Sequence, residues 1–198
     1  MINIIDGLQL AGKTTLIKEV NKDNQFKVYK FDFSYYSKLF NINKSKIGSF
    51  QLGKDLSMLY FLKDRKDENI IVDRGIFSTI YYSLLYKRLK KIDIINLFNI
   101  IEREYFNYNF IFVIKINDIK NENKRDKKDG YDKLNKKIDS NILNFIIKQC
   151  YERQIKFTVF FNNYYESIEE NSKRLKYLLE DYSKNFKEHI NEHFGNKN

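Results

Sequence analysis

The stretch GLQLAGKTT, residues 7–15, fits the pattern G-x-x-x-x-G-K-[ST] with Gly7, Gly12, Lys13 and Thr14. It directly follows a short apolar run and precedes a helix-competent segment. A strand, a glycine loop and a helix N-terminus in this order form the context that a phosphate-binding loop requires. The N–H groups of the loop and the positive end of the helix dipole both attract an anion. The stretch therefore predicts a P-loop at the start of an α/β fold.

The residues of this loop have separate predicted tasks. Lys13 is expected to reach the β- and γ-phosphates of a nucleotide, and the hydroxyl of Thr14 to ligate Mg²⁺. Gly12 lets the backbone turn tightly and bring its N–H groups towards the phosphate oxygens. The cofactors predicted on this basis are ATP and Mg²⁺. The expected ATP-binding residues are Gly7, Gln9, Ala11, Gly12, Lys13, Thr14 and Thr15.

The composition is that of a folded globular protein. The chain has 198 residues, which is long enough for one domain with a real core. Apolar residues make up 42% of it, including 17 Phe and 15 Tyr, so packing is expected and not disorder. No linker or internal repeat divides the chain. We expect a single P-loop domain over residues 1–198.

Cysteine usage and hydropathy indicate a cytoplasmic protein. The single cysteine, Cys150, excludes an internal disulfide framework and suits a reducing compartment. Met1 leads directly into the first predicted strand, so no signal peptide is expected. The longest apolar run, residues 110–114, is too short to span a bilayer, and no membrane association is expected.

The net charge of +10 predicts an affinity for polyanions. Nucleic acid is one such partner, and nucleotide substrates are another. Charge alone does not separate the two. We expect nucleotides as the partners, and nucleic acid remains an alternative that the rest of the sequence does not favour.

Apolar runs alternate with helical periodicity along the chain, which predicts strand–helix repeats around a parallel sheet. The expected fold is a three-layer α/β sandwich of the P-loop NTPase type, with five parallel strands flanked by helices. The expected strands are residues 3–5, 27–33, 70–72, 110–116 and 156–161. The expected helical faces lie within residues 52–60, 76–84, 94–101, 142–150 and 168–186.

A second motif follows the predicted strand at residues 70–72. The strand ends in Asp73-Arg74, whereas ATPases and GTPases usually end it on a lone Asp or an Asp-Glu pair. A basic residue at this place indicates that a second anion binds beside the first.

Together, the two motifs resemble the thymidylate kinase family of P-loop nucleoside monophosphate kinases. That family's pattern runs Phe-x-x-Asp-Arg, a strand, and then Asp-Arg-x-x-x-Ser-x-x-x-Tyr. The matching residues are Phe61, Asp64, Arg65, Asp73, Arg74, Ser78 and Tyr82. The resemblance is strong over residues 2–16 and 55–86 and only topological elsewhere.

The resemblance implies a role for each matching residue at the acceptor. Phe61 would stack on the pyrimidine, and Arg65 would hydrogen-bond its exocyclic oxygen. Arg74 would hold the acceptor phosphate. Asp73 would orient the waters of Mg²⁺, which makes it a metal-site residue together with Thr14.

The remaining implied contacts concern the base edge and the sugar. Ser78 and Thr79 would lie near the base edge. Tyr82 would pack under the sugar, where a ribose 2′-hydroxyl would project. The resemblance also implies assembly as a homodimer.

The segment KNENKRDKKDGYDKLNKK, residues 120–137, lies between the fourth strand and the next helix. It carries a charge of +4. P-loop kinases have a lid over the phosphates at this place, so we expect a lid at about residues 118–137. Arg125 or its lysine neighbours would then contact the transferring phosphoryl group. Lys13, Arg74 and Arg125 are thus the predicted catalytic residues. The alternative is a solvated, inert loop.

The chain departs from the family in two places. The segment KFDFSYYSK, residues 30–38, lacks the family's Arg-x-Pro element, which helps to clamp the acceptor. Gln9 stands where the family usually has an acidic residue, and Asp6 is expected to supply part of that charge.

The predicted function is ATP-dependent phosphoryl transfer to a pyrimidine deoxynucleoside monophosphate, dTMP or dUMP. An alternative is a related kinase that acts on a deoxynucleoside or on a hydroxyl of DNA, which the missing Arg-x-Pro element and the net charge favour slightly. A third interpretation, a non-enzymatic nucleotide-binding protein, would not need Arg74 or a lid.

Overall fold

A computed structural model describes residues 2–7, 11–30, 38–43, 46–65, 68–105, 108–116 and 133–180, without the side chains of residues 116 and 133–139. The strands are β1 (Ile2–Gly7), β2 (Lys27–Lys30), β3 (Ile70–Asp73), β4 (Asn109–Ile116) and β5 (Phe157–Asn163). The helices in this part of the chain are α1 (Lys13–Val20), α3 (Ile47–Leu62), α4 (Ile76–Leu85), α5 (Lys91–Glu104), α7 (Lys133–Glu152) and α8 (Ile168–Glu180).

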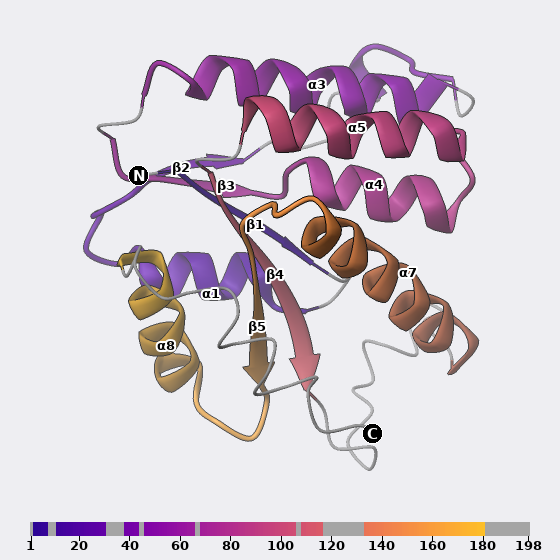
Figure 1. Cartoon of the computed structure of the whole chain (residues 1–198). Helices are drawn as coiled ribbons and strands as arrows, with labels where there is room; N and C mark the ends of the chain where they lie inside the picture. Colours follow the sequence, from indigo (N-terminus) through magenta and orange to yellow (C-terminus); the bar gives the residue numbers. More distant parts are fainter. Residues whose placement is uncertain are drawn as a thin grey trace.

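The five strands form one parallel sheet in the order β2-β3-β1-β4-β5. Parallel neighbours need crossover connections, which place helices on the faces of the sheet. Helices indeed cover both faces (Figure 1). The predicted three-layer α/β fold with five parallel strands is thereby confirmed.

The larger core lies between the sheet and the helices α3, α4, α5 and α7. It is rich in aromatic side chains. Phe77 of α4 packs edge-on against Phe110 of β4 and Phe157 of β5, with ring centroids 4.9 and 5.5 Å apart. Cys150 is buried in the same core, as its place on an apolar helix face predicts.

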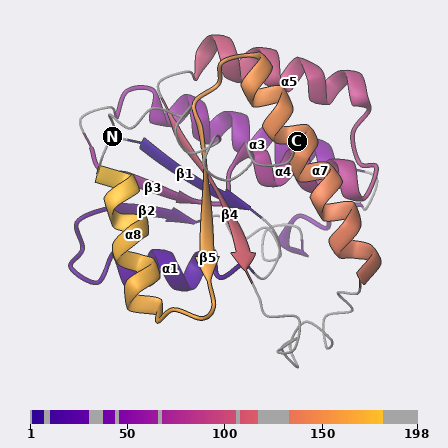
Figure 2. The same ribbon diagram turned by 60° about the horizontal axis from the view of Figure 1, so that its bottom comes forward.

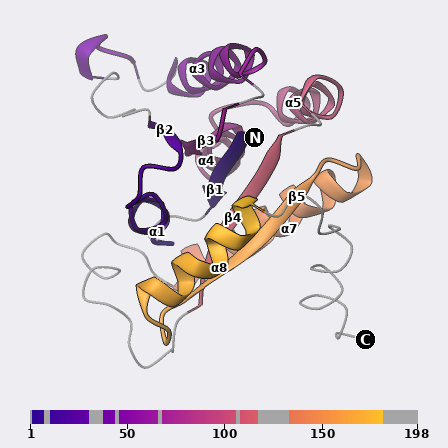
Figure 3. The same ribbon diagram turned by 90° about the vertical axis from the view of Figure 1, so that its left-hand side faces the viewer.

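The smaller core lies on the opposite face, beneath α1 and α8. These two helices lie side by side across the sheet (Figures 2 and 3). Successive residues of β1 point to opposite faces, so Ile4 joins the larger core and Ile5 the smaller one. The sheet is thus buried on both sides, which explains why its strands read as apolar runs.

The strand bounds agree with the sequence to within a few residues. Residues 31–33, predicted as the end of the second strand, lie outside the described residues, as do residues 181–186 of the last helical stripe. Most of the predicted lid, including Arg125, also lies outside them. The helix α7 begins at Lys133, so the last residues of the predicted lid segment are helical. Within the described residues, no helix combines the length and apolar character needed to cross a membrane.

The geometry of a parallel sheet places the functional edge. Gly7 ends β1, Asp73 ends β3, and α1 begins next to both at Lys13. Ligands of open α/β sheets bind outside the carboxyl ends of the strands. The site is therefore expected at this carboxyl edge.

Candidate active site

The second half of the P-loop is held against the end of β5. Asn162 is buried and donates from Nδ2 to the carbonyl of Ala11 at 3.0 Å. Gly12 caps α1 with φ +78°, in the left-handed region. A Cβ atom there would lie 2.6 Å from Nδ2 of Asn162, so both the conformation and the space require glycine. Gln9 lies outside the described residues.

Lys13 is almost completely buried, at 4% exposure, and donates from Nζ to the carbonyl of Gly7 at 3.0 Å. Burial, followed by the nearby charge of Arg74, lowers the pKa of Lys13 to about 7, while Asp6 and Asp73 oppose this change. A phosphate anion beside the ammonium group would stabilise its charged form. The position of Lys13 therefore suits a phosphate contact.

Thr14 and Asp73 meet between α1 and the end of β3. The Thr14 hydroxyl donates to Oδ2 of Asp73 at 2.9 Å. The carboxylate is buried, and its Oδ1 has no hydrogen-bond partner among the described residues. A buried acceptor without a partner is costly and suggests a missing ligand. Hydroxyl and carboxylate oxygens are ligands that Mg²⁺ prefers, so the two residues fit the predicted metal site.

Asp6 has a structural role besides the charge that it supplies near Lys13. Its buried carboxylate accepts the N–H groups of Gly75, Phe77 and Ser78 at 2.7, 3.2 and 3.0 Å. It also accepts the hydroxyl of Ser78. A carboxylate on the first N–H groups of a helix satisfies donors that otherwise lack partners. Asp6 is therefore the side-chain cap of α4, contributed from β1.

This cap fixes the backbone on which Arg74 is placed. Arg74 has φ +74°, a left-handed conformation that is uncommon for a residue other than glycine. Its N–H donates to the carbonyl of Ile5 at 3.0 Å, and its side chain is exposed. Such local strain persists only where the surrounding structure enforces it, and it is frequent at functional sites.

Arg74, just before α4, and Tyr82, on α4, form one unit. Their side chains are hydrogen-bonded, and burial raises the pKa of Tyr82 while Arg74 opposes that rise. The Tyr82 ring stacks on that of Tyr86, with centroids 6.1 Å apart and an interplanar angle of 5°. The structure thus brings together two predicted acceptor residues, Arg74 and Tyr82, near Lys13. Their contacts with an acceptor remain predictions.

Ser78 and Thr79 are both buried. Ser78 donates to Asp6, and Thr79 donates to Asp55 on α3. Each hydroxyl therefore has a structural partner inside the protein. Their predicted place at the edge of a base has no support in this arrangement.

Arg65 lies away from the other predicted acceptor residues, and its contact with a base stays a prediction. Arg65 pairs with Glu68 at 3.2 Å, and Glu68 pairs with Lys27 at 3.1 Å. Lys27 begins β2 and is in register with Ile70, the first residue of β3. Arg65 therefore lies at the amino edge of the sheet. The four-residue strand β3 separates this edge from Asp73 by about 10 Å, because each step rises about 3.3 Å.

Phe61 lies near the same end of α3. The guanidinium of Arg65 covers its ring at 4.2 Å from the centroid, and the ring of Tyr29 meets it edge-on at 5.8 Å. Phe61, predicted to stack on the base, and Arg65, predicted to hydrogen-bond it, thus form an intramolecular cation–π contact with each other. Phe61 remains 43% exposed and lines a groove, so its contact with a base stays a prediction.

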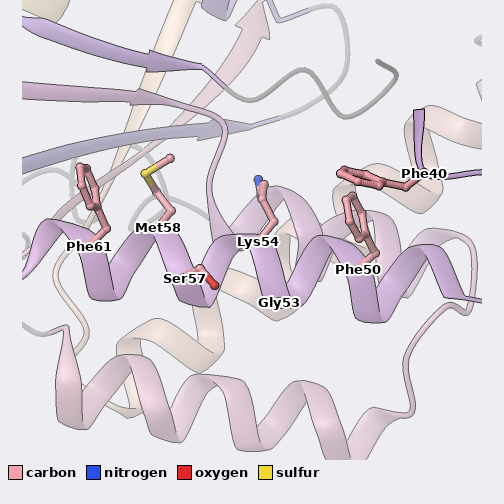
Figure 4. A pocket seen from close by; sticks show the side chains of 7 residues that line it. All are labelled: Phe40, Phe50, Gly53, Lys54, Ser57, Met58 and Phe61. Carbon is pink, nitrogen blue, oxygen red and sulfur yellow. The ribbon is translucent and has the colours of Figure 1, made fainter. Parts of the chain in front are cut away.

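This groove runs along α3 and has a volume of about 620 Å³. Figure 4 shows its lining, with Phe40 and Phe50 at one end, Met58 and Phe61 at the other, and Lys54 between them. The lining residues are Phe40, Phe50, Gly53, Lys54, Ser57, Met58 and Phe61.

Sequence reasoning missed Lys54 and Asp55. Their side chains form an ion pair, and Asp55 also accepts the hydroxyl of Thr79. Burial raises the pKa of Asp55 to about 6, although Lys54 and Thr79 act against this rise. The sequence did contain a signal for them: two adjacent charged residues lie within the apolar helical face of residues 52–60. Charged residues on a buried face are rare unless they are paired.

Comparisons with known proteins support this description. No family model matches the chain. A protein of Acidianus bottle-shaped virus (isolate Italy/Pozzuoli), named "Putative thymidylate kinase", is 36% identical over 91 residues. The match covers 46% of this chain and 53% of the viral protein, so it spans about half of that relative's length.

Solved structures of nucleoside and nucleotide kinases share the fold. The deoxyadenosine kinase from M. mycoides with bound dATP has 19% identity and a TM-score of 0.54, covering 91% of this chain and 100% of that one. The thymidylate kinase from Ehrlichia chaffeensis has 16% identity and a TM-score of 0.51, covering 90% and 98%. The expected resemblance is confirmed: this chain has the fold of the P-loop nucleoside and nucleotide kinases, and part of it is related in sequence to a thymidylate kinase-like protein.

Proposed function

We propose that this protein transfers the γ-phosphoryl group of ATP to a pyrimidine deoxynucleoside monophosphate, with dTMP and dUMP as the leading acceptors. The observation that carries the proposal is the pairing of Thr14 with Asp73 beside Lys13. The partial sequence match to a viral protein named as a thymidylate kinase supports the class of acceptor.

In this proposal the protein contributes position and charge. Lys13 neutralises the β/γ-phosphate oxygens of ATP. Thr14 and Asp73 would hold Mg²⁺, which would supply further neutralisation of the phosphate charge. Arg74, on the same edge, binds the phosphate of the acceptor. An acceptor phosphate is already an anion, so the transfer does not need a strong general base. Arg125 or a neighbouring lysine from the segment before α7 completes the cationic set in this proposal.

A deoxynucleoside acceptor is the second candidate. The absence of an arginine from residues 30–38 favours it, because a monophosphate acceptor gains from a second cation. Structural neighbours that include deoxyadenosine kinases have the same fold, which by itself does not decide between the acceptors.

The test is an ATP-consumption screen across deoxynucleosides, deoxynucleoside monophosphates and an oligodeoxynucleotide with a free 5′-hydroxyl. Activity on dTMP and dUMP above all other acceptors supports the proposal. Thymidine as the better acceptor establishes the second candidate, and activity on the oligonucleotide establishes a DNA kinase. The Lys13→Ala variant, purified in parallel, reports any contaminating kinase.

The resemblance also leads us to propose a homodimer. Light scattering coupled to size-exclusion chromatography measures the mass directly. A particle in solution with the 24.0 kDa mass of one chain would contradict the proposal, and a particle of twice that mass would support it.

A further inference from the structure

The groove along α3 contains the ammonium group of Lys54, which a buried carboxylate holds in place. Lys54 is mostly buried, with a side-chain exposure of 16%, and its ammonium group pairs with Asp55. Asp55 is buried at 2% exposure and accepts the hydroxyl of Thr79 from α4. A side chain that is tied to a second helix in this way has lost much of its rotamer freedom before any ligand binds. Such preorganisation favours recognition.

The position of Lys54 along α3 differs from that of Arg65. The contact between Asp55 and Thr79 brings the middle of α3 against the first turns of α4, which follow Arg74 directly. Arg65, beyond the end of α3, reaches the amino edge of the sheet instead. Lys54 is therefore the cation of this groove that lies towards the Arg74–Tyr82 unit.

The surroundings of Lys54 define the chemistry of its ligand. Phe50 lies one helical turn before it, and the ring of Phe40 meets that of Phe50 at 6.2 Å. In Figure 4, the Lys54 ammonium group points from α3 towards the strands, between these rings and Met58. Among the described residues that line the groove, all but Lys54 and Ser57 are apolar or glycine. A phosphate would need several donors here, whereas a flat heterocycle needs apolar walls and one or two polar contacts.

We infer that Lys54 is a specificity-determining residue that donates to a ring carbonyl oxygen of the acceptor's base, which lies against Phe50. An ammonium group has three N–H donors and no acceptor, so Lys54 can contact Asp55 and also donate to a ligand. It matches the 4-oxo group of thymine or uracil and opposes the donor 4-amino group of cytosine. Asp55 is the positioning residue of this donor. The inference rests on the proposed function. It assigns recognition of the base to Lys54 in place of Arg65.

The decisive experiment compares two substitutions that each remove one cation. Lys54→Met keeps the length of the side chain and removes its donors, and Arg65→Met does the same at the amino edge. Steady-state kcat/KM is measured for dTMP, dUMP and dCMP with each variant. We expect Lys54→Met to lower the values for dTMP and dUMP by about ten- to a hundredfold and to affect dCMP far less. Lys54→Arg should keep the preference for dTMP and dUMP over dCMP. Arg65→Met should leave the ratio of these kcat/KM values as it is in the wild type.

Loss of Lys54 leaves Asp55 buried without its cation, which can destabilise the fold. The double variant Lys54→Met/Asp55→Asn removes both charges and provides the same test if the single variant does not fold. Asp55→Asn alone should raise KM for dTMP while the KM for ATP stays at the wild-type value. A purely structural role of Asp55 would lower the melting temperature without changing the base preference.

Binding of dTMP and dCMP, measured by calorimetry without ATP, separates the assignment of Lys54 from the proposed function. A wild-type protein that binds and phosphorylates dTMP, together with a Lys54→Met variant that keeps its preference, overturns the assignment of Lys54 alone. If Arg65→Met loses the preference for dTMP over dCMP, the assignment of Lys54 is overturned as well. A wild-type protein that neither binds nor phosphorylates any monophosphate refutes the proposed function, and the assignment falls with it.

Discussion

The hydroxyl of Thr14 donates to Oδ2 of Asp73 at 2.9 Å, which joins the first turn of α1 to the end of β3. These residues are 59 positions apart in the chain. Oδ1 of the same carboxylate is buried and has no hydrogen-bond partner among the described residues. A divalent cation at this place would satisfy it.

Substitution of Asp73 should change how turnover depends on the Mg²⁺ concentration. We expect Asp73→Asn to raise the Mg²⁺ concentration needed for half-maximal turnover by at least about tenfold, because an amide is a weaker ligand than a carboxylate. Thr14→Val should act in the same direction, whereas Thr14→Ser keeps the hydroxyl and serves as the control. The measurement is a Mg²⁺ titration of ATP turnover, with EDTA as the metal-free limit. Identical titration curves for wild type and Asp73→Asn would exclude this metal site.

Lys13 offers a test of the P-loop itself. Lys13→Ala should lower kcat by about a hundredfold or more, because a fixed cation beside the transferring phosphoryl group is lost. The matched control is Lys18→Ala, on an exposed position of the same helix. Circular dichroism should show that both variants fold. Wild-type turnover in Lys13→Ala would remove the basis for the proposed kinase.

Arg74 should distinguish a phosphate acceptor from a hydroxyl acceptor. We expect Arg74→Gln to raise KM for every deoxynucleoside monophosphate by about the same factor, since the side chain would bind phosphate and not base. Thymidine, if it is used at all, should be affected much less. Arg103→Gln on α5 is the control, because the Arg103 side chain is 76% exposed and pairs with Glu104. A base-dependent effect of Arg74→Gln would contradict its assignment to the phosphate.

Asp55 should make the stability of the fold depend on pH. Burial raises its pKa to about 6 in the folded state, above the value of an unfolded chain. The folded state therefore binds more protons between about pH 4 and pH 6, and the contribution of Asp55 to the free energy of unfolding falls as the pH rises through this window. The full change is at most roughly 3 kcal/mol.

Denaturant unfolding of wild type and Asp55→Asn at several pH values measures this effect, because asparagine does not titrate. The difference in free energy between the two should decline from pH 4 to pH 6 and then level off. Glu152→Gln, on an exposed position of α7, controls for carboxylates in general. A difference that stays constant across the window would mean that Asp55 has an ordinary pKa.

Much of the fold could be predicted from the sequence because its signals are local. The P-loop stretch and the Asp73-Arg74 pair are each contiguous, and each follows an apolar strand, so their meeting at one edge of a parallel sheet follows from topology. The structure places Lys13, Thr14 and Asp73 together as expected. The strand bounds follow equally from apolar runs, because a sheet covered on both faces needs apolar side chains on both.

Only the tertiary structure decided which residues lie on each edge of the sheet. The spacing of Phe61 and Arg65 matched a motif, but α3 returns towards the start of β3, and this carries Arg65 to the amino edge with Glu68. The role of Asp6 was equally hidden, because its partners at Gly75–Ser78 are about 70 residues away along the chain. A pattern in sequence records residue types and spacing along the chain. The direction of a helix against its sheet, and hence the groove occupied by Lys54, depends on packing between distant segments.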